Sequence, residues 1–137
     1  MITTQNLTDL AGRILLAAIF LMSGINKIGG YAGTQGYMEA MGVPGVLLPL
    51  VIALEAAGAI AIILGWNTRL FAFLLAGFTL LSALLFHRAL GDQMQFILFM
   101  KNLAMAGGFL FLVARGAGDW SLDARREFHI TPARDRS

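Results

Sequence analysis

Two ionisable residues lie in apolar stretches long enough to cross a membrane, and they are the first candidates for chemistry. Glu55 comes 11 residues after Pro44, which is about 16 Å along a helix. Lys101 lies in a later stretch, about 10 Å from its start. A charged side chain at such depth is costly unless it is protonated, paired or hydrated. We therefore predict that Glu55 and Lys101 form a catalytic ion pair in which Glu55 exchanges a proton.

Five further polar residues are expected to converge on the same intramembrane cavity. Ser23, Asn26 and Lys27 are spaced at i, i+3 and i+4, so they share one face of a helix. His87 and Asn102 lie at the same end of their own apolar stretches. We predict that these five residues bind a ligand. An apolar entrance to the cavity is expected at Phe86, Phe96 and Phe99.

Each of these residues also has a purely structural interpretation. Lys27 can extend its amine to the lipid headgroups, and His87 can anchor the chain at the membrane surface. Asn102 can hydrogen-bond to a neighbouring helix. An ion pair of Glu55 with Lys101 can be structural, with no ligand beside it. The sequence leaves these alternatives open.

The elements that must position these residues follow from the composition. Of the 137 residues, 58% are hydrophobic and 13% are charged, whereas a soluble domain carries roughly 25% charged residues. Half of the 18 charged side chains lie from Arg115 onward. So few charges cannot cover a water-soluble surface. This composition excludes a soluble enzyme, a disordered segment and a nucleic-acid binder, and it predicts an integral membrane protein.

Four stretches reach the roughly 20 apolar residues that a membrane-spanning helix needs, and none alternates like a barrel strand. We predict an all-α, antiparallel four-helix transmembrane bundle at residues 10–114. A polar segment (1–9) precedes it and a charged cytoplasmic tail (115–137) follows it. A short lid in the 29–43 link, helical near 34–41, is expected over the outer mouth. The predicted spans are residues 10–28, 44–64, 69–86 and 96–114.

The distribution of Lys and Arg indicates how the bundle is oriented. Seven such residues flank the side of the bundle that holds both termini, and two flank the other side. Basic residues accumulate on the cytoplasmic side of membrane proteins, so both termini are predicted to be cytoplasmic. The seven are Arg13, Arg69, Arg115, Arg125, Arg126, Arg134 and Arg136, and the two are Lys27 and Arg88. Arg13 is interpreted as a marker of this side or as a side chain that reaches the lipid headgroups.

The residues that are missing also restrict the chemistry. The chain has no cysteine, which excludes thiol relays, zinc–thiolate sites and cysteine-ligated iron–sulfur clusters within it. No phosphate-binding glycine loop or metal triad is present. We expect no metal and no covalently bound cofactor. A redox centre would have to be a diffusible molecule, such as a quinone, or a cofactor of a partner protein.

Several short motifs, taken in order, resemble the DoxX family of small bacterial membrane proteins over about residues 10–123. They are Gly12-Arg13, Phe20-Leu21-Met22-Ser23-Gly24-Ile25-Asn26-Lys27, Gly42-Val43-Pro44, Glu55-Ala56-Ala57-Gly58, Phe86-His87, Lys101-Asn102-Leu103, Gly107-Gly108 and Ser121-Leu122-Asp123. The resemblance implies a multi-pass protein of the bacterial inner membrane. Members are often labelled oxidoreductases, and some are similar to the small membrane subunit of thiosulfate:quinone oxidoreductase.

The first functional hypothesis is therefore a membrane subunit of a redox system. Its outward-facing polar site would take a quinone or a small oxidisable molecule, and its partners would be the lipid bilayer, a second copy or a redox protein, but no nucleic acid. A second hypothesis is a non-catalytic assembly subunit that docks a larger partner. A third is an oligomeric transporter of small solutes, in which Lys27 and Lys101 attract an anion.

Overall fold

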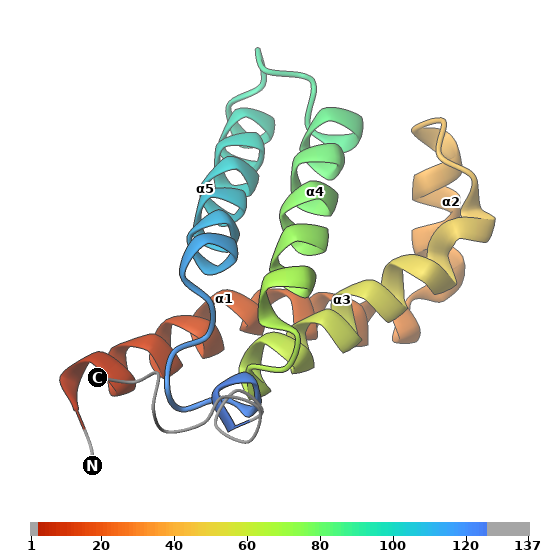
Figure 1. The fold of residues 1–137 in the computed structure, drawn as a ribbon. Coiled ribbons are helices and arrows are strands. Elements are labelled where there is room, and N and C mark those ends of the chain that lie inside the picture. The colour runs from red at the N-terminus through yellow and green to blue at the C-terminus, as the bar shows by residue number, and fades with distance from the viewer. Residues whose placement is uncertain (1–2, 126–137) are drawn as a thin grey trace.

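The computed structural model describes residues 3–125, and all regular structure in that range is helical (Figure 1). Four of the helices are long and apolar enough to cross a membrane, as predicted. Within each of the two helix pairs described below, the two helices run in opposite directions (Figure 1). The elements are α1 (Thr4–Gly29), α2 (Tyr31–Ala40), the 3-10 turn η1 (Gly45–Leu47), α3 (Leu48–Leu64), α4 (Thr68–Phe86) and α5 (Gln93–Arg115).

Two of the spanning helices begin earlier than their apolar stretches because polar residues cap them. Thr3 accepts a hydrogen bond from the backbone of Asn6 at 3.0 Å, so α1 starts in the polar N-terminal segment. Asp92 does the same for the backbone of Gln95 at 3.1 Å, so α5 starts before Phe96. Such caps satisfy backbone N–H groups that would otherwise have no partner. The link helix α2 likewise begins three residues before the expected 34–41 segment.

The four spanning helices pack as two pairs. α1 packs mainly on α3, and α4 packs mainly on α5, whereas α1 and α5 meet at few places. In Figure 1 the α4–α5 pair stands upright and crosses the α1–α3 pair at a steep angle. We call the end of the bundle near residue 65 the terminal end, and the end near α2 the lid end.

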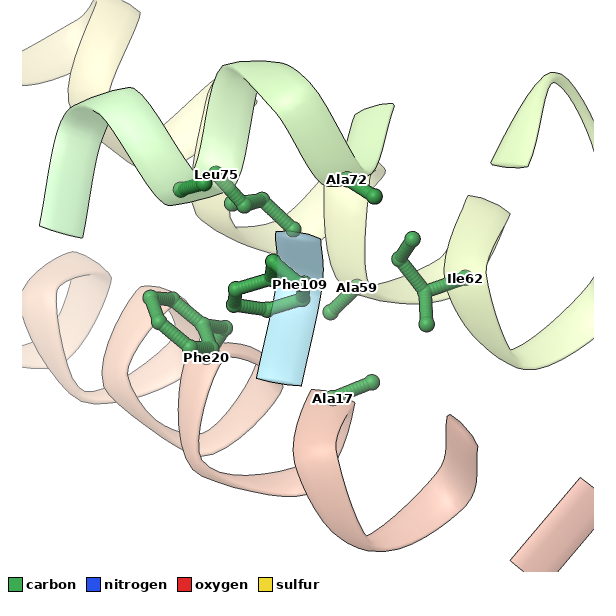
Figure 2. Close-up of a cluster of buried hydrophobic side chains, with 8 residues drawn as sticks. Ala17, Phe20, Ala59, Ile62, Ala72, Leu75 and Phe109 are labelled. Atoms are coloured by element: carbon green, nitrogen blue, oxygen red, sulfur yellow. The ribbon is translucent and has the colours of Figure 1, made fainter. Parts of the chain in front are cut away.

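A small hydrophobic core holds the two pairs together (Figure 2). Phe20 of α1 and Phe109 of α5 meet edge to face, with ring centroids 5.2 Å apart. Aromatic pairs favour this geometry. Alanines on α1, α3 and α4 surround the rings and let the helix backbones approach closely. The core residues are Ala17, Phe20, Ala59, Ile62, Ala72, Leu75, Ala76 and Phe109.

The terminal end is tied together by Arg13, whose side chain is 1% exposed. Its guanidinium donates to the carbonyl oxygens of Ile62 at 3.3 Å and Ile63 at 3.1 Å, and also to that of Trp120. Carbonyls at a helix C-terminus lack partners inside the helix, so Arg13 caps α3. From the sequence, Arg13 is interpreted as a marker of the cytoplasmic side or as a side chain that reaches the lipid headgroups. Neither interpretation is sufficient, because the side chain is buried among backbone carbonyls.

The segment after α5 closes the terminal end from the other side. The carboxylate of Asp123 accepts hydrogen bonds from the backbone N–H groups of Asn67 and Thr68, both at 2.8 Å. The backbone N–H of Asp123 donates to the carbonyl of Gly65 at 2.8 Å. Asp123 thus caps α4 at the turn where Gly65, with φ +71°, ends α3. The last part of the predicted tail, residues 126–137, lies outside the described residues.

Candidate ligand-binding and catalytic site

The centre of the site is an ion pair between α1 and α3, below the lid end. The Lys27 ammonium lies 2.9 Å from Oε1 and 3.1 Å from Oε2 of Glu55. It also donates to Ser23 Oγ at 2.5 Å, one helical turn earlier on α1. An ammonium has three N–H donors, so these three acceptors use all of them. Glu55 is 2% exposed, and its charge is balanced by the amine of Lys27.

The close approach of α1 and α3 makes this pair possible. A Cβ atom on Gly24 would lie 3.2 Å from the backbone nitrogen of Ala56 and 3.3 Å from its Cβ. Only glycine fits without displacing the neighbouring helix. Gly24 lies next to Ser23, and Ala56 lies next to Glu55. The glycine therefore sets the separation over which Lys27 and Glu55 meet.

The predicted pairing of Glu55 with Lys101 is wrong, because Lys27 takes that place. Lys101 is exposed, and within residues 3–125 its amine has no hydrogen bond or ion pair. The prediction matched the two residues by depth along their helices. Depth along a helix does not determine how that helix is rotated about its axis. Lys27 lies on α1, the helix that packs most closely on α3, and it therefore reaches Glu55. The interpretation of Lys27 as a residue that reaches the lipid headgroups is excluded for the same reason.

Six of the seven predicted site residues nevertheless line one cavity, with a volume of about 150 Å³. We call it the polar cavity. Its floor is the hydrophobic core, since Phe20 belongs to both. Asn26 is exposed and faces a separate surface hollow beside Lys27. The predicted residues in the polar cavity are Ser23, Lys27, Glu55, His87, Lys101 and Asn102, accompanied by Ile19, Phe20, Phe78, Thr79, Ser82 and Met105.

Two of the polar residues are held in place by neighbouring helices. Asn102 is buried and donates to the backbone carbonyl of Thr79 at 3.3 Å, which joins α5 to α4. This is the structural contact considered for Asn102, and its carbonyl oxygen has no hydrogen bond within residues 3–125. His87 Nδ1 lies 2.9 Å from Gln95 Oε1. An amide oxygen only accepts hydrogen bonds, so this contact requires a proton on Nδ1 of His87.

A second, mostly apolar hollow adjoins the polar cavity, and sequence reasoning missed it. We call it the apolar cleft; its volume is about 380 Å³. It runs between α3, α4 and α2, where Tyr37 stacks on Phe86 with ring centroids 5.5 Å apart. Of the predicted entrance residues only Phe86 lines it, while Phe96 and Phe99 do not. Its apolar wall includes Met38, Val43, Leu47, Leu50, Val51, Leu54, Leu81 and Leu85.

The polar cavity and the apolar cleft share part of their walls. The shared residues are Lys27, Glu55, Phe78, Ser82 and His87. The ion pair therefore lies at the boundary between a small polar space and a larger apolar one. Binding sites for small molecules commonly combine an apolar wall with a few convergent polar groups. Within residues 3–125 no group of three or more His, Cys, Asp or Glu side chains is arranged to hold a metal ion.

Four spanning helices around a buried ion pair and a cavity define a multi-pass membrane protein with a polar site inside its bundle. The sequence model of the DoxX family matches residues 8–88. This match covers more than half of the chain, and the chain belongs to the DoxX family. Ser23, Lys27, Glu55 and His87 lie inside the matched range, whereas Lys101 lies beyond it.

Three curated proteins are similar to the chain. The inner membrane protein YqjF of Escherichia coli (strain K12) is 54% identical over 114 residues, 83% of this chain and 88% of that protein. The inner membrane protein YphA of the same strain is 39% identical over 125 residues, 85% of this chain and 88% of that protein. Bacillus subtilis (strain 168) has a protein named "Putative oxidoreductase CatD", which is 29% identical over 73 residues, 53% of this chain and 54% of that protein.

The family, the two Escherichia coli relatives and the four spans together locate the chain in the bacterial inner membrane. No solved structure matches the chain significantly.

Proposed function

We propose that the chain is the membrane subunit of a redox system and that it binds a quinone or a small oxidisable ring compound inside its bundle. The observation that carries this proposal is the position of the Lys27–Glu55 pair at the boundary of the polar cavity and the apolar cleft. A quinone likewise has a polar part and an apolar part, with ring oxygens at one end and an apolar tail at the other. The ring oxygens would lie in the polar cavity and the tail in the apolar cleft.

The composition of the two spaces supports a ligand more than a purely structural role. An ion pair that only joined α1 to α3 would need no hollow beside it. Here polar groups from α1, α3, α4 and α5 line one space of about 150 Å³. A subunit that only docked a larger partner would have no use for such a cavity. The ligand hypothesis accounts for the ion pair, the cavity and the cleft together.

The proposed chemistry assigns proton transfer to this chain and electron transfer to a partner. Reduction of a quinone to its hydroquinone takes up two electrons and two protons. The electrons would come from the redox cofactor of a partner protein, since such chemistry belongs to cofactors rather than to side chains. Glu55 and His87 both line the cavity and are the groups that can hold and pass a proton. Lys27 is the ion-pair partner that fixes the position of the Glu55 carboxylate.

The relatives support the redox part of the proposal only through one name. The Bacillus subtilis protein is called an oxidoreductase in its name, and its similarity covers 53% of this chain. The two Escherichia coli relatives are named for the inner membrane alone. The redox role therefore has to be tested on the site itself.

Binding of decylubiquinone to the purified protein in lipid nanodiscs tests the proposal. We expect wild type to bind it and Glu55→Gln to bind it at least about tenfold more weakly, because the substitution removes the carboxylate that holds the Lys27 ammonium at the wall of the cavity. The matched control is Glu39→Gln, which removes an exposed carboxylate that lines neither space. Glu39→Gln should bind within about twofold of wild type, since distant surface substitutions have small effects.

Two results would overturn the proposal. One is absence of quinone binding by wild type. The other is equal binding by wild type and Glu55→Gln, which would mean that any quinone bound lies elsewhere on the bundle.

A further inference from the structure

The charges around the polar cavity do not balance. Glu55 is the one carboxylate that lines it among residues 3–125, whereas both Lys27 and Lys101 do. Lys27 already neutralises Glu55 at 2.9 Å. The cavity therefore carries the positive charge of Lys101 in excess, within a bundle that crosses the membrane.

The two amines also differ in what they can still bind. All three N–H donors of Lys27 are used by Glu55 and Ser23. The amine of Lys101 has no hydrogen bond or ion pair with any residue from 3 to 125. An incoming ligand thus finds the donors of Lys27 occupied and those of Lys101 available.

A lysine at this depth normally has an acceptor or lines a water-filled space. No second carboxylate on the described part of the chain lines the cavity to serve as that acceptor. The hydrogen bond of the adjacent Asn102 does not supply an acceptor for the Lys101 amine either, because Asn102 donates in that bond to the backbone oxygen of Thr79. The acceptor that fits this arrangement is an oxygen of the ligand.

We infer that the ligand of the polar cavity carries an ionised oxygen, such as an enolate or phenolate on its ring, and that Lys101 binds this oxygen. The inference rests on the proposed function, because it specifies the head group of the same ligand. Glu55 and His87 remain the groups that exchange protons, while Lys101 selects the charge of the ligand. The plain alternative is that Lys101 extends its amine along α5 to the headgroups at the lid end.

Two naphthoquinones that differ in one ionisable group test the inference. Lawsone carries a hydroxyl that is ionised at neutral pH, and its methyl ether cannot ionise there. Wild type in nanodiscs should bind lawsone at least about tenfold more tightly than the ether, as expected for one charge-assisted hydrogen bond. In Lys101→Met the preference should fall to within about twofold, because lawsone binds more weakly while the ether is unaffected. Lys101→Arg should keep the preference, since arginine keeps the charge.

The matched control is Arg88→Met. Arg88 is an exposed cation that follows α4 at the lid end and lines neither the polar cavity nor the apolar cleft. This variant should keep the preference for lawsone, so a loss caused only by surface charge would be recognised. Because Lys101 is itself exposed, its replacement should leave the helical circular dichroism signal unchanged.

The outcomes separate the inference from the proposed function. Equal binding of both probes by wild type, or an unchanged preference in Lys101→Met, would overturn the inference and leave a quinone site standing. Binding of neither naphthoquinone while decylubiquinone still binds would overturn the inference alone, and binding of none of the three quinones would overturn both. Binding of the ether with no binding of lawsone would show that the cavity rejects anions, which contradicts the inference directly.

Discussion

Among the single side chains, Lys27 determines the electrostatics of the site. Its ammonium balances Glu55, which is 2% exposed, and it holds Ser23 at the same time. Removing one partner of a buried ion pair leaves a charge without compensation. Replacing both partners with apolar residues is far less harmful, because no charge is left behind. The stability of the bundle should therefore respond very differently to a single and a double substitution.

Lys27→Met should lower the free energy of unfolding by about 3 kcal/mol, since it strands the carboxylate of Glu55 in the bundle. Adding Glu55→Leu to the same chain should restore the stability to within about 1 kcal/mol of wild type. Unfolding by SDS in mixed micelles, followed by circular dichroism, measures both values. Arg88→Met serves as the control for loss of a lysine-like charge at the same end. A Lys27→Met variant as stable as wild type would mean that the pair does not form in the membrane.

The residue types of the site were predictable from the sequence, but their partners were not. A carboxylate and an amine inside apolar stretches stand out from composition alone. Six of the seven residues chosen in this way line one cavity. Which amine meets Glu55 depends on the rotation of each helix about its axis, and the sequence positions give only the depth. The exposed position of Asn26 follows from the same rotation.

Among the helices, the contact of α1 with α3 at Gly24 sets the geometry of the ion pair. The position of Gly24 against Ala56 allows the two backbones to approach, and the paired side chains lie within one turn of it. A larger side chain there would force the helices apart by a few tenths of an ångström or more. Ser23, Lys27 and Glu55 would then no longer share all of their hydrogen bonds.

Gly24→Val should lower the free energy of unfolding by about 1–3 kcal/mol, the usual effect of overpacking, and should also weaken decylubiquinone binding. The control is Gly12→Val on the same helix, where a Cβ atom would meet nothing within 4 Å. That variant should leave quinone binding unchanged. Unfolding in mixed micelles and binding in nanodiscs are measured on both variants. Equal effects of the two substitutions would assign the loss to valine in a helix rather than to the α1–α3 contact.

Helix positions were easier to predict than helix ends and contacts. The four apolar stretches are all spanning helices, because only a helix satisfies its own backbone groups in lipid. The early starts of α1 and α5 come from caps on Thr3 and Asp92 that lie outside those stretches. The apolar cleft went unrecognised since it needs α2, α3 and α4 together, and no local pattern in any one of them indicates a hollow.

At the scale of the whole molecule, the two ends of the bundle are built differently. Arg13 and Asp123 fasten the terminal end through backbone groups of residues far apart in the chain. The lid end carries the polar cavity and the apolar cleft, and α1 and α5 make few contacts. Ligand access from the lid end is therefore consistent with a bundle that is held together at the opposite end. Deleting residues 115–137 would remove Asp123, so such a deletion tests folding as much as partner binding.

The structure changes which basic residues indicate the orientation of the bundle in the membrane, but the predicted orientation stays the same. Arg13 is buried on backbone carbonyls and Lys27 is paired with Glu55, so neither is free to meet lipid headgroups. Among the described residues, three exposed arginines remain at the terminal end and one at the lid end. They are Arg69, Arg115 and Arg125 against Arg88. The exposed arginines alone therefore still favour a cytoplasmic terminal end.

We accordingly expect the polar cavity and the apolar cleft to lie in the outer half of the membrane. Green fluorescent protein fused after Ser137 should fluoresce, and alkaline phosphatase fused there should be inactive, because the first folds in the cytoplasm and the second only outside it. Alkaline phosphatase inserted between Arg88 and Asp92 should be active, since that turn joins α4 to α5 at the opposite end. Western blotting controls for expression of each fusion. The reverse pattern of activities would place the site in the cytoplasmic half, where a ligand would have to reach it from inside the cell.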